Sequence, residues 1–480
     1  MTTNYGLIFD NRFATLPTDF YTSMAAEGFA KSPFLIHLNQ DMAQEIGLDP
    51  QSTQDSDFPA YFSGNKNLLG SKPVAMVYSG HQFGVWAGQL GDGRALLLGQ
   101  VRGKNNPLWD MHLKGSGQTP YSRMGDGRAV LRSCIREYLC GEAMHGLGIP
   151  TTRSLCIIGS GEQVAREKWE PGAILTRLSP SHIRFGHFEH FFSHQRPDLI
   201  KLLADHVIQL YFNGLSYQDW FAEIVKRTAR LMAQWQAVGF AHGVMNTDNM
   251  SILGLTLDYG PFGFMEAYDP HFICNHSDPG GRYAFDQQPT VAYWNLQVLG
   301  YVLQSLIPEQ MARDILATFP TEYHSFYQEL MTAKLGIAKP DAHDQEIWIK
   351  LLDLMAKDKA DYTKVFHILS GVVAGQDNKV FKALFQDQAL VQDWLSLYFN
   401  RMRQEAPGYQ ARMKKINPKY ILRNWVAETA IRAAEDHQDY TVIDDLMKIF
   451  KNPYAEHAGM EKFAQEAPQE MRDLCVSCSS

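Results

Sequence analysis

Residues 85–98 read Val-Trp-Ala-Gly-Gln-Leu-Gly-Asp-Gly-Arg-Ala-Leu-Leu-Leu, two largely apolar runs with a Gly-Asp-Gly turn between them. Short apolar runs bounded by glycine predict β-strands, and the turn predicts that residues 85–90 and 95–98 pair as a β-hairpin. Further short strands are expected at residues 111–114, 155–158 and 173–176. This part of the chain is therefore predicted to form a sheet.

The pattern changes on both sides of these strands. Residues 127–146 carry apolar side chains at helical spacing and end on glycine, which predicts a helix within the strand-rich part. From about residue 196 the chain is mainly helical, with long periodic segments at residues 199–212 and 217–238. A strand-rich first half followed by a helical second half predicts an α+β fold with two lobes around a cleft.

Composition narrows the class of protein. The 480 residues amount to about three domains of average size, and the 45% hydrophobic and 20% charged residues exclude wholesale disorder. With 52 acidic against 44 basic residues the net charge is −8, so we expect no nucleic-acid partner. No run approaches the ~20 apolar residues of a membrane span, and residues 1–17 lack the apolar core of a signal peptide. We therefore expect no membrane partner and a cytoplasmic location.

Four polar features occur in an order that suits the binding of a nucleoside triphosphate. They are the glycine-rich residues 88–94, Lys114 at the end of the next strand, Glu137 in the following helix, and a polar loop at residues 242–249 ahead of Asp258. Glycines let backbone amides approach phosphate oxygens, and a strand-borne lysine adds a positive charge.

The acidic and amide side chains of this set also have roles toward a triphosphate. Glu137 falls near the apolar stripe of its helix, where a carboxylate requires a cation, and Lys114 is the candidate partner. Asn249 and Asp258 offer the hard oxygen ligands that suit Mg²⁺ on a polyphosphate.

The same order of features is that of a protein kinase, with one departure. A kinase places its catalytic aspartate five residues before the metal-binding asparagine, and here that position is Val244. A valine can neither orient nor deprotonate a hydroxyl group. By kinase rules, the chain is expected to be a pseudokinase.

Long strings of this sequence resemble the selenoprotein O family, whose bacterial members are also called YdiU. The resemblance is carried by residues 78–94, by Leu-Lys-Gly-Ser-Gly-Gln-Thr-Pro-Tyr-Ser-Arg at residues 113–123, and by His-Gly-Val-Met-Asn-Thr-Asp-Asn at residues 242–249. It continues through residues 417–424 to a Cys-x-x-Cys tail and covers nearly the whole chain.

The resemblance implies a protein-kinase-like bilobal fold with an N-terminal extension and a helical C-terminal region. We expect the extension at residues 1–70 and a strand-rich, nucleotide-binding lobe at residues 71–196. A second lobe with the metal-binding loop is expected at residues 197–330, and the helical region with its cysteine tail at residues 331–480.

The resemblance also implies an enzyme that transfers AMP from ATP to Ser, Thr or Tyr hydroxyls of target proteins and releases pyrophosphate. ATP would lie flipped in the cleft with its α-phosphate toward the acceptor and Mg²⁺ or Mn²⁺ as cofactor, and some members are said to transfer UMP with manganese. Asp248 would be the general base, and Asn249 and Asp258 would hold the metal. The implied nucleotide contacts are Gly91, Gly93, Arg94, Lys114, Asp126, Gly127, Arg177, Arg184 and Asp258.

The cysteines predict one further feature. Six scattered cysteines do not make a disulfide framework, but Cys475 and Cys478 form a Cys-x-x-Cys pair two residues from the end of the sequence. We expect this pair to act as a redox switch. The two thiols can close a disulfide with each other, or one of them can pair with Cys274, which follows Asp258 by sixteen residues.

Two other functions fit the same residues. A conventional kinase can use Asp248 as a displaced base, and a catalytically inert ATP-binding scaffold is what Val244 alone suggests. Taken singly, the glycine turn, Lys114 and the two arginines are most often structural. Their ordered co-occurrence favours the enzyme, and ATP labelled in the α- or the γ-phosphate distinguishes the three functions.

Overall fold

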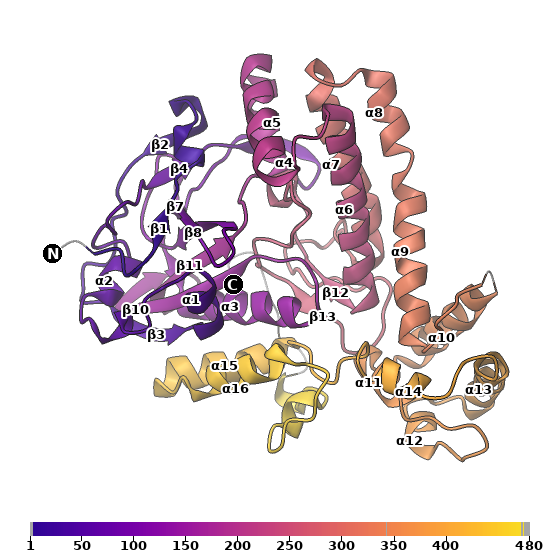
Figure 1. Ribbon diagram of the computed structural model, residues 1–480. Helices are drawn as coiled ribbons and strands as arrows, with labels where there is room; N and C mark the ends of the chain where they lie inside the picture. The colour runs from indigo at the N-terminus through magenta and orange to yellow at the C-terminus, as the bar shows by residue number, and fades with distance from the viewer. Residues whose placement is uncertain (1–2, 342, 472–473, 475–480) are drawn as a thin grey trace.

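The computed structural model describes residues 3–341, 343–471 and 474 and has an α+β fold (Figure 1). Strands precede most of the helices along the chain, as predicted. The largest sheet of the described residues is antiparallel and has nine strands in the order β2-β4-β7-β8-β11-β10-β3, with β1 beside β7 and β9 beside β11. These strands are β1 (Ile8–Phe9), β2 (Tyr21–Ser23), β3 (Phe34–Leu38), β4 (Val74–Met76), β7 (Ala95–Arg102), β8 (Leu108–Lys114), β9 (Ala129–Val130), β10 (Arg153–Ala165) and β11 (Trp169–Ser179).

Helices lie beside the sheet and extend beyond it (Figure 1). Beside the sheet are α1 (Gln40–Glu45), α2 (Phe58–Phe62) and α3 (Leu131–Gly146). The central helices are α4 (Phe185–Ser193), α5 (Pro197–Tyr211), α6 (Tyr217–Ala237), α7 (Gln288–Val302), α8 (Glu309–Leu316) and α9 (Phe319–Lys334). The C-terminal helices are α10 (Asp344–Asp358), α11 (Tyr362–Leu369), α12 (Lys379–Lys382), α13 (Gln388–Met402), α14 (Tyr409–Met413), α15 (Asn424–His437) and α16 (Thr441–Lys451). No described helix is both long and apolar enough to cross a membrane.

The helix predictions hold well at the level of whole elements. The expected segments 199–212 and 217–238 correspond to α5 and α6 within two residues at each end. The predicted helix at residues 127–146 ends at Gly146 as expected, but it begins at Leu131. It begins late because Ala129–Val130 is extended and pairs with β11 as strand β9.

Alternation along β8 separates an apolar face of the sheet from a polar one. Met111 and Leu113 are fully buried in a core with side chains of α1 and α2, which cover the outer face. His112 and Lys114 therefore point to the inner face, toward α3. Because β11 pairs with β8 in antiparallel register, Arg177 lies opposite His112 on the same inner face.

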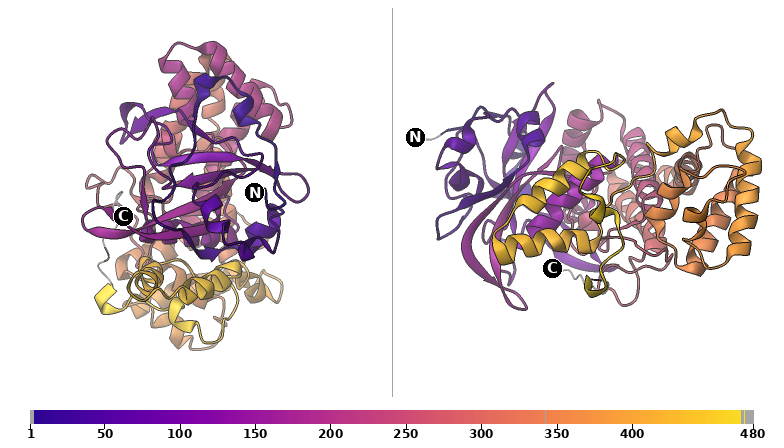
Figure 2. Two further views of the ribbon diagram at one scale, coloured as in Figure 1. Left: turned by 90° about the vertical axis from the view of Figure 1, so that its left-hand side faces the viewer. Right: turned by 90° about the horizontal axis from the view of Figure 1, so that it is seen from below.

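The largest apolar core lies on that inner side and includes residues from both ends of the chain. It contains side chains of β10, β11 and α3, of the central helices α5 to α7, and of α15 and α16. Helices α15 and α16 pack against α3 (Figure 2). A Cβ on Gly146 would lie 1.8 Å from the carbonyl oxygen of Phe450, so only glycine lets α3 and α16 approach this closely. A separate core joins α10, α11 and α13.

The predicted hairpin between residues 85–90 and 95–98 is wrong. Residues Val85–Gln89 form strand β6, but β6 pairs with β5 (Ser79–Gln82) through a turn at Phe83 and Gly84, both with positive φ. Positive φ at both central residues is the turn geometry that two-residue hairpins favour. Asp92 explains why the later turn is not a hairpin: its carboxylate accepts hydrogen bonds from the Met76 amide of β4 and from His112 of β8, 3.0 Å each.

Candidate active site

A cavity of about 860 Å³ lies between the inner face of the sheet and the loops that follow α6. It is bounded by the glycine-rich segment, the loop at residues 121–128 and the loops at residues 244–261. The residues that the sequence predicted for nucleotide binding, metal binding and proton transfer all line this cavity: Gly91, Gly93, Arg94, Lys114, Asp126, Gly127, Arg177, Arg184, Asp248, Asn249 and Asp258. A larger cavity, about 1240 Å³ between β3 and α16, contains none of them.

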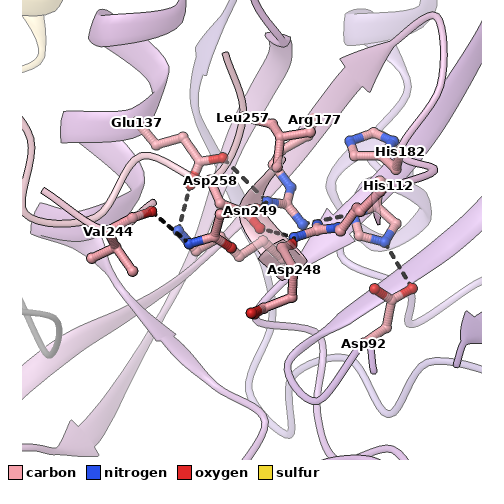
Figure 3. A network of polar contacts seen from close by, with 12 residues as sticks. Asp92, His112, Glu137, Arg177, His182, Val244, Asp248, Asn249, Leu257 and Asp258 are labelled. Atoms are coloured by element: carbon pink, nitrogen blue, oxygen red, sulfur yellow. Dashed lines mark hydrogen bonds and ion pairs between the residues drawn. The ribbon is translucent and has the colours of Figure 1, made fainter. Parts of the chain in front are cut away.

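Lys114 and Glu137 form a buried ion pair beside this cavity. The Lys114 Nζ donates to Glu137 Oε2. Arg177 Nη1 donates to Glu137 Oε1 at 3.4 Å (Figure 3). Burial by itself would raise the pKa of Glu137, but the charges of Lys114 and Arg177 outweigh it and hold the pKa below its ordinary value. Glu137 is thus ionised, and it positions two cations at the cavity wall.

Asp258 is a second carboxylate of the cavity, on a loop that follows α6, and it is held by two arginines. Its Oδ1 accepts from Arg177 Nη1 at 2.6 Å, and its Oδ2 accepts from Arg184 Nη1. Burial acts to raise its pKa, but Arg184 and Arg177 lower it well below the usual value. The backbone φ of Asp258 is +60°, a left-handed conformation that is uncommon outside glycine and that often marks functional sites.

Two residues that the sequence reasoning missed support Arg177. Arg177 Nη2 donates to His112 Nδ1 at 2.7 Å, and His112 Nε2 lies 3.0 Å from the Asp92 carboxylate (Figure 3). Because an arginine side chain can only donate hydrogen bonds, His112 Nδ1 must be the acceptor. The His112 proton is therefore on Nε2, which donates a hydrogen bond to the Asp92 carboxylate. The His112 ring also stacks on His182 with 4.4 Å between centroids. Strand alternation was the available signal, since it places His112 on the same face as Lys114.

Asp248 lies in a short 3₁₀ turn (Thr247–Asn249) of the loop that follows α6, and its backbone carbonyl accepts from Arg184 Nη1 at 2.8 Å. Its Oδ2 accepts from Gln82 Nε2 at 3.3 Å, whereas its buried Oδ1 has no hydrogen-bond partner among the described residues. Burial raises the pKa of Asp248 to about 6, against the lowering effects of Arg184 and Gln82. A Cβ on Gly80 would lie 3.1 Å from Asp248 Oδ1, so strand β5 approaches this oxygen closely. A carboxylate with an unused oxygen and a pKa near neutrality suits proton transfer.

Asn249 and Asp258 are the candidate metal ligands. Asn249 Nδ2 donates to the Val244 carbonyl at 3.1 Å, which directs the amide and keeps Asn249 Oδ1 for another partner (Figure 3). The described residues contain no group of three or more His, Cys, Asp or Glu side chains that could hold a metal ion. Mg²⁺ commonly binds one or two protein oxygens together with phosphates and waters. The two residues therefore fit an ion that arrives with a nucleotide, once an arginine contact of Asp258 is exchanged.

The remaining predicted contacts lie at the rim of the cavity. Arg94 is exposed and forms no ion pair with a described residue, whereas Asp126 pairs with Arg166 at 2.7 Å. The glycines are explained by packing within the chain. A Cβ on Gly91 or Gly93 would lie 2.6 to 2.8 Å from atoms of Tyr121. The glycine-rich segment is thus packed closely by the loop that follows β8.

Of the predicted redox residues, only Cys274 lies in the described part of the chain, and Cys475 and Cys478 lie outside it. Cys274 is buried, and its Sγ lies 3.4 Å from the Ala241 carbonyl oxygen. A Cβ on Gly243 would lie 2.7 Å from this sulfur. Cys274 therefore packs directly against the loop that carries Asp248 and Asn249.

Comparison with known proteins adds an independent observation. Residues 4–451 match the family model described as "Protein adenylyltransferase SelO". Curated relatives named "Protein nucleotidyltransferase YdiU" align over nearly their full length: the protein of Myxococcus xanthus is 49% identical over 100% of both chains. That of Bordetella avium is 49% identical over 99% of this chain and 98% of its own. That of Yersinia pseudotuberculosis is 46% identical over 99% of this chain and 100% of its own.

Proposed function

This chain belongs to the SelO family of protein adenylyltransferases and is a protein nucleotidyltransferase, and on that premise we propose how it acts. It transfers AMP from ATP to Ser, Thr or Tyr hydroxyls of target proteins and releases pyrophosphate. The observation that carries this proposal is one cavity with buried cations on its sheet side and an under-coordinated carboxylate, Asp248, on its loop side.

The proposed orientation of ATP is flipped relative to that in a kinase. The β- and γ-phosphates lie against Lys114, Arg177 and Arg184, and the α-phosphate lies toward Asp248. A triphosphate brings about three to four negative charges into a buried site, and arginine forks are suited to compensate them. Both arginines have a replaceable partner in Asp258. Phosphate oxygens can therefore take over part of an ion-pair network that is already assembled.

Proton transfer is assigned to Asp248. The Asp248 carboxylate accepts the proton of the acceptor hydroxyl as the hydroxyl oxygen bonds to the α-phosphorus. The bond from the α-phosphorus to the bridging oxygen breaks, and pyrophosphate leaves toward Arg177 and Arg184. A bound Mg²⁺ or Mn²⁺, held by Asn249 and Asp258, would neutralise phosphate charge. Val244, at the position of the kinase base, contributes its carbonyl to orient Asn249.

We also propose which type of α+β fold this is. The fold would be protein-kinase-like and bilobal, with the boundaries expected from the sequence at residues 70, 196 and 330. Its support is the buried pairing of a strand lysine with a helix glutamate, together with a metal-binding asparagine and aspartate on loops across the cavity. UMP transfer with manganese would use the same triphosphate contacts.

A labelling experiment tests the proposed reaction. Purified protein is incubated with target proteins, Mg²⁺ or Mn²⁺, and ATP labelled in either the α- or the γ-phosphate. We expect protein-bound label from the α-position only, and a mass increase equal to one AMP. Label from the γ-position only would identify a kinase. Retained ATP binding without either label would identify a scaffold.

We further propose that the C-terminal thiols regulate the enzyme. A disulfide from Cys475 or Cys478 to Cys274 would tether the tail beside the loop of Asp248, whereas a disulfide within the tail would leave it untethered. Reduced and oxidised protein should then differ in transfer rate, and Cys478→Ser should remove the difference. Non-reducing peptide mapping identifies the pairing. Free tail thiols after mild oxidation, with unchanged activity, would refute the switch.

A further inference from the structure

Exposed apolar side chains gather on the β5–β6 hairpin and the loop beside it. Phe83 is 39%, Val85 69%, Trp86 40% and Ile273 41% exposed. We call these four residues, with Arg282 and Trp294, the hairpin surface. A single exposed apolar residue is ordinary, but a group of them beside an active site marks an interaction site.

The members of the hairpin surface are linked by close contacts. A Cβ on Gly84 in the hairpin turn would lie 2.8 Å from Arg282 Cζ, and the Arg282 guanidinium lies 5.0 Å from the centre of the Trp294 ring. His81 lies between Trp86 and Trp294, at 5.2 and 5.5 Å from their rings. Ile273, Arg282 and Trp294 also line a cavity of about 600 Å³. The surface is therefore continuous and hollowed.

The hairpin surface adjoins the proposed general base. Three consecutive residues of the hairpin bind the loop that carries Asp248. The His81 amide donates to Thr247 Oγ1 at 2.8 Å, and the Phe83 amide donates to Asn246 Oδ1 at 3.1 Å. Between them, Gln82 binds the Asp248 carboxylate itself. A polypeptide segment bound on this hairpin would therefore have its side chains within reach of Asp248.

The positive charge of Arg282 indicates the charge of the partner that the hairpin surface prefers. Arg282 forms no ion pair with a described residue, its buried Nε has no hydrogen-bond partner there, and its guanidinium lies over Trp294. The acid that shares its cavity, Asp286, forms a hydrogen bond with His271 Nδ1 at 2.8 Å and no ion pair with Arg282. A cation held against an aromatic ring without a carboxylate favours an anionic partner.

We propose that the hairpin surface binds the acceptor segment of the protein substrate. An apolar side chain close to the acceptor hydroxyl packs on Phe83, Val85, Trp86 and Ile273, and a carboxylate nearby pairs with Arg282. This inference rests on the proposed AMP transfer and adds a substrate preference to it. A lipid surface fits poorly, because the hairpin surface offers one cation and the protein has a net charge of −8.

Synthetic peptides with a single Ser, Thr or Tyr test this preference. Each carries a leucine beside the acceptor, and one glutamate is moved through the four positions on either side. The controls replace glutamate with lysine and leucine with serine. AMP incorporation from α-labelled ATP is measured by mass spectrometry as kcat/KM. The wild type should favour the best glutamate peptide over its lysine counterpart by about tenfold, since charge complementarity selects partners.

Three variants of the full-length protein sharpen the test. Arg282→Glu should reverse the charge preference, and Val85→Ser and Trp86→Ala should raise KM for the leucine peptides about three- to thirtyfold, as loss of an interface anchor does. Val380→Ser is the matched control, because Val380 is also 69% exposed but lies on α12. Arg230→Glu is the matched control for charge, because Arg230 also lies over an aromatic ring, that of Phe326 at 5.5 Å. All variants should bind ATP as the wild type does in calorimetry.

The outcomes separate this surface from the proposed function. Reversed preference in Arg282→Glu, with both controls unchanged, supports the surface. Equal preference in the wild type and Arg282→Glu, or labelling of the protein itself but of no peptide, overturns the surface and leaves AMP transfer intact. If the wild type transfers no α-label to any acceptor, both the proposed function and the proposed role of the hairpin surface are refuted.

Discussion

The two sides of the active-site cavity differ in how their charges are paired. On the sheet side, Lys114 and Arg177 pair with Glu137, and Arg177 and Arg184 pair with Asp258. On the loop side, Asp248 leaves one buried oxygen without a hydrogen-bond partner among the described residues. Buried polar groups without partners are costly and rare, so they often mark function. In the proposed reaction, the cations of the sheet side hold phosphates in place of Asp258, and Asp248 on the loop side receives the proton of the acceptor hydroxyl.

The largest expected effect concerns the loop side. Asp248→Asn keeps the shape of the side chain but removes its basicity, so kcat for AMP transfer should fall by about 10²–10⁴-fold while ATP binding is largely retained. Single-turnover labelling and calorimetry measure the two quantities. Asp445→Asn, a surface change on α16, is the control. A variant that lost ATP binding but turned over bound nucleotide normally would make Asp248 a binding residue.

Removing the carboxylate that Arg177 and Arg184 share should have a different signature. Asp258→Ala should lower transfer by more than about 10²-fold, because a metal ligand is lost. The same change releases Arg177 and Arg184 from their shared partner, so metal-free ATP should bind at least as tightly as it does to the wild type. Mass spectrometry and calorimetry with chelator test both parts. Undiminished AMP incorporation would remove Asp258 from the metal site.

The arginines themselves test the flipped orientation of ATP. Arg177→Gln combined with Arg184→Gln should weaken ATP binding by about 10–100-fold, because two charge-assisted phosphate contacts are lost. Adenosine binding should change far less. Arg102→Gln is the control, since Arg102 pairs with Asp10 away from the cavity. Equal losses of ATP and adenosine affinity would contradict phosphate contacts by these arginines.

The smallest expected effect is a shift in pH dependence. Asp248 accepts a proton only when ionised, so the transfer rate should fall as the pH drops through its raised pKa of about 6. The hydrogen bond from Gln82 stabilises the ionised form and lowers that pKa. Gln82→Leu should therefore move the acid limb of the pH–rate profile to higher pH. A limb that stayed in place would show that a different group sets it.

The same groups contribute to stability with opposite signs. Asp248 titrates higher in the folded protein than the ordinary aspartate value, so its ionisation disfavours folding above about pH 6. Glu137 and Asp258 titrate lower than usual, so their contribution is present at neutral pH and is lost as the pH falls below the ordinary carboxyl range of about 4. Urea unfolding from about pH 2 to about pH 8, with Asp248→Asn for comparison, separates the two contributions.

The sequence predicted those elements and residues whose signal is local. The periodic segments became α5 and α6, and the helix ending at Gly146 became α3. The hairpin prediction failed because two glycine-containing turns lie within ten residues of each other. Which of them closes a hairpin depends on the contacts of Asp92 with β4 and β8. Contacts between strands that are distant in sequence do not appear in a local pattern. Alternation along β8 places His112 on the same face as Lys114, but its contact with Arg177 depends on the register of β8 with β11.

The sequence by itself determined the chemical inventory: a strand lysine, a helix glutamate, two arginines after a strand, and acidic and amide groups on a polar loop. It also determined the family, because that inventory lies in long strings whose order along the chain is unusual. Only the tertiary structure decided which charges neutralise one another and which remain for a ligand. Arg177 and Arg184 converge on Asp258, whereas the Asp248 oxygen and Arg282 stay without an opposite charge or donor in the described chain. Electrostatic pairing depends on distance and burial in three dimensions, and both arise only when the sheet, α3 and the loops after α6 pack together.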